Sequence, residues 1–268
     1  MSGFDIFSLE GLIFDIDGTL VRGGQPLPGL NDLFTFLRQQ GIAYTVASNN
    51  STKTPQQYYT RLQSWGADIP LENILTSALA TARFLRERFP AGDTIFMLGQ
   101  QGLRQALLEA GYNVIEDFSQ KAQAAVIGGD YDLTYNKLKH AILHIQHGAL
   151  FIGTNPDIVF PTEEGLVPEC GTTLAAIQAA TGIAPIVIGK PQPLLFEMAL
   201  QRMASKPQYT AIVGDRLDSD ILGGKRLGIG TILVKTGVDS ETTVEKKGIQ
   251  PDLILKDLQD LLKRLQGS

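Results

Sequence analysis

The sequence has little cysteine, no surplus of positive charge and no long apolar run, and each absence excludes a class of protein. Its single cysteine, Cys170, cannot form an intramolecular disulfide, which fits a reducing compartment. The formal net charge is -5 and Lys and Arg do not cluster, so we expect no nucleic-acid partner. No stretch approaches the length of a membrane span, and residues 1–10 lack a basic segment followed by an apolar one. We therefore expect a cytoplasmic protein that does not associate with membranes.

The sequence does contain enough apolar material for a large core. Its 268 residues suit one large domain or two modest ones, and 43% hydrophobic and 19% charged residues are typical of soluble globular proteins. Short apolar runs alternate with segments of helical periodicity along the chain. This alternation favours an α/β fold built on a doubly wound parallel sheet.

The chain is organised around an apolar run that ends in two carboxylates. Residues 12–14 predict a strand buried on both faces, so Asp15 and Asp17 lie at its carboxyl end. Residues i and i+2 of a strand point to the same side, so the two carboxylates can converge on one cation. Magnesium prefers such hard oxygen ligands. Taken alone, the same two aspartates could simply end the strand in a turn.

A second apolar run, residues 42–47, ends in hydroxyls and amides that begin with Ser48 and Asn49. Such groups at a strand end can bind an anion through their side chains and the backbone N–H groups. They can equally cap the helix expected from Pro55. This pattern alone leaves both interpretations open.

Two later apolar runs end in the same way. Residues 184–188 predict a strand followed by Lys190, whose charge could face phosphate oxygens or lie in a solvated loop. Residues 210–213 predict a strand that ends before Asp215 and Asp220. Because the carboxyl ends of parallel strands lie at one edge of a sheet, we expect all these polar groups to meet. Carboxylates for a metal, with a polar loop and a lysine for an anion, indicate metal-assisted phosphoryl chemistry.

These four motifs resemble those of the haloacid dehalogenase (HAD) superfamily of aspartyl phosphatases. Residues 15–19 resemble the first motif of the family, and residues 48–50 resemble the second. Lys190 resembles the third motif, and Asp215 with Asp220 further on resembles the fourth. The insertion between the second and third motifs is similar to that of the capped branch that holds the 4-nitrophenyl phosphatase and phosphoglycolate phosphatase group.

The resemblance implies a Rossmann-like core domain and an inserted α/β cap domain. We expect residues 1–83 and 183–268 to form the core, and residues 84–182 to form the cap. The cap would close over the site and exclude water, and its loops would choose the substrate. The cap could also mediate a homodimer, although no specific surface patch marks it.

The resemblance also implies a role for each motif residue. Asp15 would attack phosphorus and form an aspartyl-phosphate, while Asp17 would protonate the leaving alcohol and then activate water. Mg²⁺ would bind the Asp15 carboxylate, the Asp17 carbonyl and Asp215, and Asp220 would orient metal waters or Lys190. The phosphoryl oxygens would be held by Ser48, Asn49 and Lys190.

The implied function is Mg²⁺-dependent hydrolysis of small phosphate monoesters. A phosphomutase with the same residues is an alternative, and a catalytically silent binding or regulatory protein on this scaffold is another. The sequence departs from the branch pattern at residues 168–171, where the family more often has a glycine near Cys170. The substrate therefore stays open among small phosphorylated metabolites, namely sugar phosphates, nucleotide monophosphates, phosphoglycolate and pyridoxal phosphate.

Two further features invite a chemical interpretation that we do not favour. His140, His144 and His147 share the helix expected over residues 134–147, opposite its apolar face, so we predict solvated histidines and no metal site there. Cys170 lies near an expected helix start, and we predict a small packed thiol that is not a nucleophile.

Overall fold

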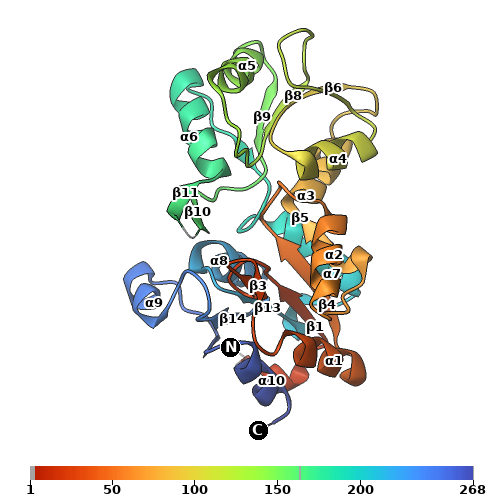
Figure 1. The fold of residues 1–268 in the computed structure, drawn as a ribbon, viewed down its shortest axis with the longest axis vertical. Helices are drawn as coiled ribbons and strands as arrows, with labels where there is room; N and C mark the ends of the chain where they lie inside the picture. The colour runs from red at the N-terminus through yellow and green to blue at the C-terminus, as the bar shows by residue number, and fades with distance from the viewer. Residues whose placement is uncertain (1–3, 163, 268) are drawn as a thin grey trace. The chain divides into compact units, whose positions relative to one another are not determined.

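The computed structural model describes residues 4–162 and 164–267, which form two compact α/β units (Figure 1). The first unit comprises the chain up to Ser48, Gln56–Leu75 and the chain from Lys190 onward. The second unit comprises Asn49–Pro55 and Thr76–Gly189. The mainly parallel sheets of both units confirm the predicted α/β class. The functional division into a core and a cap, with boundaries at residues 84 and 182, stays a prediction.

The first unit contains a six-stranded sheet in the order β15-β14-β13-β1-β4-β5. Strand β1 pairs in parallel with both β4 and β13, and Phe14 lies opposite Val46 and Val213. The chain therefore adds β4 and β5 on one side of β1 first, and β13, β14 and β15 on the other side later. This is the doubly wound topology that we expected. The strands are β1 (Gly11–Phe14), β4 (Ala43–Ser48), β5 (Ile74–Thr76), β13 (Thr210–Gly214), β14 (Gly230–Val234) and β15 (Leu253–Leu255).

Helices cover both faces of this sheet, which is why β1 is apolar throughout and does not alternate. Phe14 belongs to a core that also holds apolar residues of helices α1 and α10, which contact each other. Helix α7 packs on β1 and β4, and α8 packs on β14. The helices of the unit are α1 (Leu30–Gln40), α2 (Pro55–Ser64), α7 (Pro193–Met203), α8 (Leu222–Leu227), α9 (Glu241–Lys247) and α10 (Leu258–Leu265).

Shorter elements complete the first unit. Strands β2 (Val21–Arg22) and β3 (Gln25–Pro26) form a small antiparallel pair just after the first motif. A π-helical turn, η4 (Leu217–Ile221), connects β13 to α8. The 3-10 turns are η1 (Ile6–Ser8), η2 (Leu71–Asn73) and η3 (Pro207–Tyr209).

The second unit contains a five-stranded sheet in the order β12-β9-β8-β6-β7, with every neighbouring pair parallel. Helices α5 and α6 contact each other and bury their apolar residues against this sheet. No helix within residues 4–162 and 164–267 is both long and apolar enough to cross a membrane. The elements are β6 (Thr94–Leu98), β7 (Asn113–Ile115), β8 (Ala124–Ile127), β9 (Leu150–Gly153), β12 (Ile186–Val187), α3 (Ser77–Arg86), α4 (Gln101–Glu109), α5 (Tyr135–Gln146), α6 (Cys170–Thr181), and a hairpin of β10 (Val159–Thr162) with β11 (Gly165–Pro168).

The strand that precedes Lys190 belongs to the second unit, which corrects its expected place in the sheet that carries the first motif. Ile186 and Val187 pair with β9, and the amide of Ile188 continues this pairing by donating to the carbonyl of Gly153 at 3.0 Å. The apolar run predicted a strand, but its composition does not specify which of two parallel sheets it joins. That choice depends on partners far away in the sequence.

Helix α5 corrects the prediction for one of its histidines. The imidazole of His144 is 2% exposed and contacts the rings of Phe96 and Phe118 in tilted arrangements, with ring centroids 4.7 and 4.8 Å away. His147 is exposed as predicted, and His140 is half-buried. Helical periodicity placed His144 opposite the apolar face, but its ring contacts both Phe96 of β6 and Phe118 of the loop between β7 and β8.

Candidate active site

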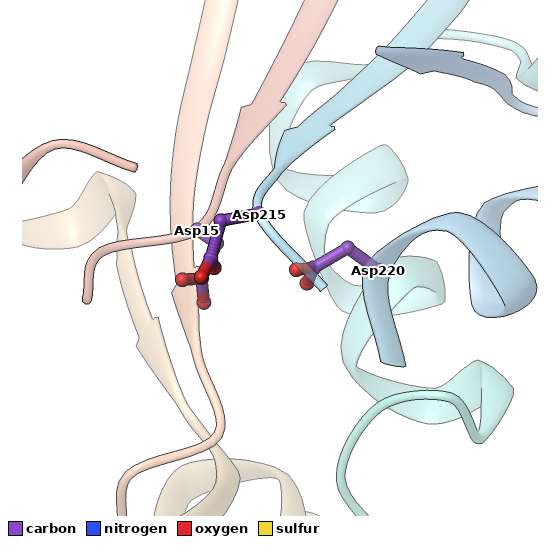
Figure 2. Close-up of side chains that lie close together, drawn as sticks. All are labelled: Asp15, Asp215 and Asp220. Carbon is purple, nitrogen blue, oxygen red and sulfur yellow. The ribbon is translucent and has the colours of Figure 1, made fainter. Parts of the chain in front are cut away.

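The candidate site lies at the carboxyl ends of β1 and β13, the two neighbouring strands from which the sheet extends in opposite directions. Asp15 directly follows β1, Asp215 directly follows β13, and Asp220 comes from η4. Figure 2 shows these three side chains close together, and their carboxylate oxygens lie within 4.8 Å of one another. Open parallel sheets bind ligands at such a switch point. The fold therefore brings the first and fourth predicted motifs into one cluster.

Lys190 connects this cluster to the second motif. Its Nζ lies 2.6 Å from Oδ1 of Asp15 and 2.7 Å from Oδ1 of Asp220, and it donates to the carbonyl of Ala47 at 2.9 Å. Burial acts to lower the pKa of Lys190, but the charges of the two carboxylates outweigh burial and hold this pKa above its usual value. The lysine is therefore a fixed positive charge at neutral pH.

The carboxylates have raised pKa values because burial disfavours their charged forms. Burial raises the pKa of Asp15 well above its usual value, since Lys190 offsets only part of that effect while Asp220 and Asp215 add repulsion. Burial and the charge of Asp220 raise the pKa of Asp215 to about 7. The ammonium group of Lys190 contacts only Asp15 and Asp220, and a bound cation would further offset the repulsion among the three carboxylates.

Asp215 has the surroundings of a metal ligand. Its Oδ2 accepts a hydrogen bond from the amide of Val238 at 2.8 Å, whereas its Oδ1 is buried without a hydrogen-bond partner in the described part of the chain. The backbone of Gly18 and Gly237 approaches this carboxylate so closely that a Cβ at either position would overlap it. A buried carboxylate oxygen without a partner, next to the carboxylate of Asp15, suits a hard divalent cation. The donor set therefore fits a divalent metal ion.

Asp17 lies in different surroundings from Asp15. It is half-buried, forms a β-bridge with Val21 and lines a small pocket together with Arg61. The cluster of three carboxylates contains the side chain of Asp15 but not that of Asp17. The side chains of the two aspartates of the first motif thus have different surroundings, as their different predicted roles require.

Ser48 and Asn49 fall on different units. Ser48 ends β4 and is buried, with its Oγ 3.4 Å from the hydroxyl of Tyr58, and it directly follows the residue whose carbonyl accepts from Lys190. Asn49 belongs to the second unit, where its Nδ2 donates to Oδ2 of Asp157 at 3.1 Å. The structure therefore places Ser48 in the unit of the aspartates, and the role of Asn49 stays a prediction.

Sequence reasoning did not identify the segment 236–239, which follows β14. The Oγ1 of Thr236 donates to the carbonyl of Gly18 at 2.6 Å, and Oδ2 of Asp239 accepts from the amide of Leu217 at 2.7 Å. A polar residue just past an apolar strand marked the four recognised motifs. Thr236, two positions after the end of β14, carries the same signal.

Cys170 is a packed thiol of the second unit, as expected. It is fully buried and donates to the carbonyl of Ile127 at 3.3 Å. Burial raises the pKa of this thiol to about 11, so it is protonated at neutral pH.

Comparison with known families defines the class of protein. Residues 12–113 match the model of a family described as haloacid dehalogenase-like hydrolase, and residues 187–261 match a model described as HAD-hydrolase-like. The first match contains Asp15, and the second contains Lys190 and Asp215. The doubly wound sheet and the cluster at its switch point are accordingly those of a hydrolase of the haloacid dehalogenase type.

Relatives with named activities specify this class further. An acid sugar phosphatase of Staphylococcus aureus (strain USA300) is 38% identical over 257 residues, which cover 96% of this chain and 98% of that protein. A 4-nitrophenylphosphatase from Thermotoga maritima matches with a TM-score of 0.91 and 34% identity, covering 97% of this chain and 99% of the other. A glycerol phosphate phosphatase from Mycobacterium tuberculosis, in complex with calcium, matches with a TM-score of 0.86 and 31% identity over 94% of this chain and 74% of the other. The chain belongs to the haloacid dehalogenase-like hydrolases and is a phosphatase of the 4-nitrophenylphosphatase type, as its motifs predicted.

Proposed function

We propose that this phosphatase hydrolyses small phosphate monoesters with Mg²⁺ and through an aspartyl-phosphate on Asp15. The observation that carries the proposal is the buried contact of Asp15 with Lys190, beside the unpartnered Oδ1 of Asp215. The names of the relatives, an acid sugar phosphatase and a glycerol phosphate phosphatase, support small phosphate monoesters as substrates. Phosphates of sugars and of small polyols are therefore the first substrates to test.

Asp15 supplies the nucleophile in this mechanism. Lys190 holds Oδ1 of Asp15 at 2.6 Å, which orients the carboxylate and favours its charged form. An Asp15 oxygen bonds to phosphorus while the bond from phosphorus to the ester oxygen breaks. Lys190 would also stabilise the negative charge of the phosphoryl oxygens, with Ser48 and Asn49 as the further groups expected to hold them.

Asp17 supplies the proton transfers. In the first step it gives a proton to the leaving alcohol, and in the second it takes one from the water whose oxygen attacks phosphorus. The second step breaks the bond between Asp15 and phosphorus, releases inorganic phosphate and restores both aspartates. The different surroundings of Asp15 and Asp17 support this division of roles.

The metal would be held by the carboxylates of Asp15 and Asp215 and by the main-chain carbonyl of Asp17. When bound, Mg²⁺ neutralises charge on the transferring phosphoryl group. Mg²⁺ is usually bound by one or two carboxylates together with a substrate phosphate, and the cluster offers such a set. Asp220 contacts Lys190 and would keep the lysine directed at Asp15.

Substrate choice belongs, in this proposal, to the inserted residues 84–182. We infer that this stretch serves as the cap and that its loops select the alcohol part of the substrate. A dimer formed through the cap stays a proposal that sedimentation at several protein concentrations would test.

The nucleophile is tested by the substitution Asp15→Asn. With 4-nitrophenyl phosphate and Mg²⁺, we expect kcat to fall by at least about 10⁴-fold, because the amide cannot attack phosphorus. Asp218→Asn is the matched control, since Asp218 lies on the same acidic segment as Asp215 but is exposed and pairs with Lys247. Retained hydrolysis by Asp15→Asn would overturn the assignment.

The intermediate and the products are tested separately. After rapid mixing with a ³²P-labelled monoester and acid quenching, we expect protein-bound label that hydroxylamine removes, as an acyl phosphate requires. Asp17→Asn should not turn over the monoester, whether or not it accumulates this label. Free inorganic phosphate as product supports the phosphatase, whereas an isomeric sugar phosphate would indicate a phosphomutase.

A further inference from the structure

We propose that the segment 236–239 positions both halves of the metal site, with Thr236 and Asp239 as its positioning residues. The inference rests on the proposed metal-binding role of Asp15 and Asp215. Among the described residues, the cluster of carboxylates that could hold the metal contains no residue of this segment. The segment contacts Asp215 itself, and also Gly18 and Leu217, which lie close in sequence to the other residues of the site.

Thr236 holds the first half of the site. Its Oγ1 donates to the carbonyl of Gly18 at 2.6 Å. Gly18 directly follows Asp17, whose own carbonyl is the proposed third ligand, and it has a φ of +93° that only glycine adopts readily. Fixing the Gly18 carbonyl fixes the turn that directs the Asp17 carbonyl.

Two consecutive amides of the same segment hold the second half of the site. The amide of Val238 donates to Oδ2 of Asp215 at 2.8 Å, and the amide of Asp239 donates to the main-chain carbonyl of Asp215 at 3.0 Å. Oδ2 is thereby engaged, whereas Oδ1 has no hydrogen-bond partner among the described residues and is the oxygen that we expect to bind the metal. Gly237 permits this approach, because a Cβ there would overlap the Asp215 carboxylate.

Asp239 extends the support to the turn that carries Asp220. Its buried carboxylate accepts from the amide of Leu217 at 2.7 Å, at the first residue of η4. Lys247 Nζ lies 3.1 Å from Oδ1 of Asp239 and compensates its charge. A carboxylate that accepts from the first amides of a helical turn fixes where that turn begins.

The segment therefore contacts two regions that are distant from each other in the sequence, namely Gly18 and the stretch that contains Asp215 and Leu217. Groups that orient metal ligands without touching the metal commonly change metal affinity when they are removed. A residue with such a role should alter the dissociation constant for Mg²⁺ even when no substrate is present.

The test is isothermal titration of the full chain with Mg²⁺ in the absence of substrate. Thr236→Val keeps the shape but removes the O–H donor, and we expect it to raise the Kd for Mg²⁺ by about 10-fold. Thr236→Ser retains the donor and should bind Mg²⁺ as the wild type does. Thr242→Val is the matched control, because Thr242 is exposed on α9 and its Oγ1 interacts with Ser240 at 2.9 Å.

The outcomes separate this inference from the proposed function. If Asp215→Asn binds Mg²⁺ as tightly as the wild type, the proposed metal site itself is wrong. If Asp215→Asn loses Mg²⁺ while Thr236→Val binds it normally, the positioning role is overturned. The kinetic signature is a raised Mg²⁺ requirement, so saturating Mg²⁺ should restore kcat in Thr236→Val.

A folding defect would not obscure the result. Urea unfolding in EDTA shows whether each variant is folded before titration. Should Thr236→Val fail to fold, Asp239→Ala carries the test, and unchanged Mg²⁺ affinity in that variant would contradict the inference equally.

Discussion

The Nζ of Lys190 lies 2.6 Å from Oδ1 of Asp15, although 175 positions separate the two residues in the chain. Both groups are buried, and the same lysine also contacts Asp220. Removing charges from water is unfavourable unless they are paired, so each member of this network depends on the others. The network explains why a lysine can be 1% exposed in the first unit.

Replacing this lysine should destabilise the protein strongly. Lys190→Met leaves the carboxylates of Asp15 and Asp220 buried without their counter-charge, and we expect the free energy of unfolding to fall by about 3–5 kcal/mol. Urea unfolding in EDTA measures this loss. The control is Lys235→Met, which removes an exposed pair with Glu241 and should cost less than about 1 kcal/mol. Equal effects of the two substitutions would show that the Lys190 network contributes little to stability.

The pKa of Asp215 predicts how the stability of the metal-free protein depends on pH. Burial raises this pKa from 3.8 to about 7 in the folded protein, so the folded state holds the proton more tightly than the unfolded state does. The resulting stability is present at low pH and is lost as the pH rises through about 7. Asp215→Asn lacks this titration.

We therefore compare the free energies of unfolding of the wild type and Asp215→Asn in EDTA. Between pH 5 and pH 8, the stability of the wild type should fall relative to that of the variant. Mg²⁺ competes with the same proton, so its affinity for the wild type should increase over this range. Parallel stability curves for the two proteins would contradict the raised pKa.

Cys170 should resist alkylation in the native protein. Burial raises the pKa of its thiol to about 11, so at pH 8 little thiolate is present and the sulfur is covered. Iodoacetamide at pH 8 should label the protein stoichiometrically in guanidinium chloride and negligibly without it, as mass spectrometry would show. Rapid labelling of the folded protein would indicate that the second unit opens locally.

His144 should contribute to the stability of the second unit, whereas His147 should not. The ring of His144 stacks on Phe96, and its Nε2 lies 2.8 Å from the carbonyl oxygen of Asp117. His144→Ala should lower the free energy of unfolding by about 2–3 kcal/mol, since it removes a buried ring and its polar contact. His147→Ala, at the exposed residue that caps the carboxyl end of the same helix, should change it by less than about 0.5 kcal/mol. Similar losses would mean that His144 is less tightly packed than its burial indicates.

Much of the site could be predicted because its chemistry is local in the sequence. Asp15 and Asp215 each come immediately after a buried strand, and parallel strands place their carboxyl ends at one edge. The strand of Lys190 was assigned to the wrong sheet, yet the lysine does lie beside Asp15. The charge of the lysine and its position just past an apolar run were enough to predict that it belongs to the site. The residues near that run do not indicate that it pairs with β9.

Other features could not be predicted, because they depend on packing between remote segments. Phe118 covers His144 from a loop outside helix α5, so helical periodicity could not show the burial of that ring. Thr236 and Asp239 acquire their significance from contacts with Gly18 and Leu217, which lie 218 and 22 positions away in the sequence, respectively. Thr236 does follow an apolar strand as the recognised motifs do, but its neighbours in the sequence do not show that it contacts Gly18.

The sequence by itself determined the class of fold, the four motifs and the chemistry that their residue types allow. These follow from short-range regularities: apolar runs, helical periodicity and the placement of a carboxylate or an ammonium group just after a strand. The tertiary structure alone decided which sheet each strand joins, which oxygen of Asp215 remains without a partner, and which distant segment holds the site in place. Those properties arise when burial brings remote residues together, since hydrogen bonds and charges acquire their energies from surroundings that the local sequence does not contain.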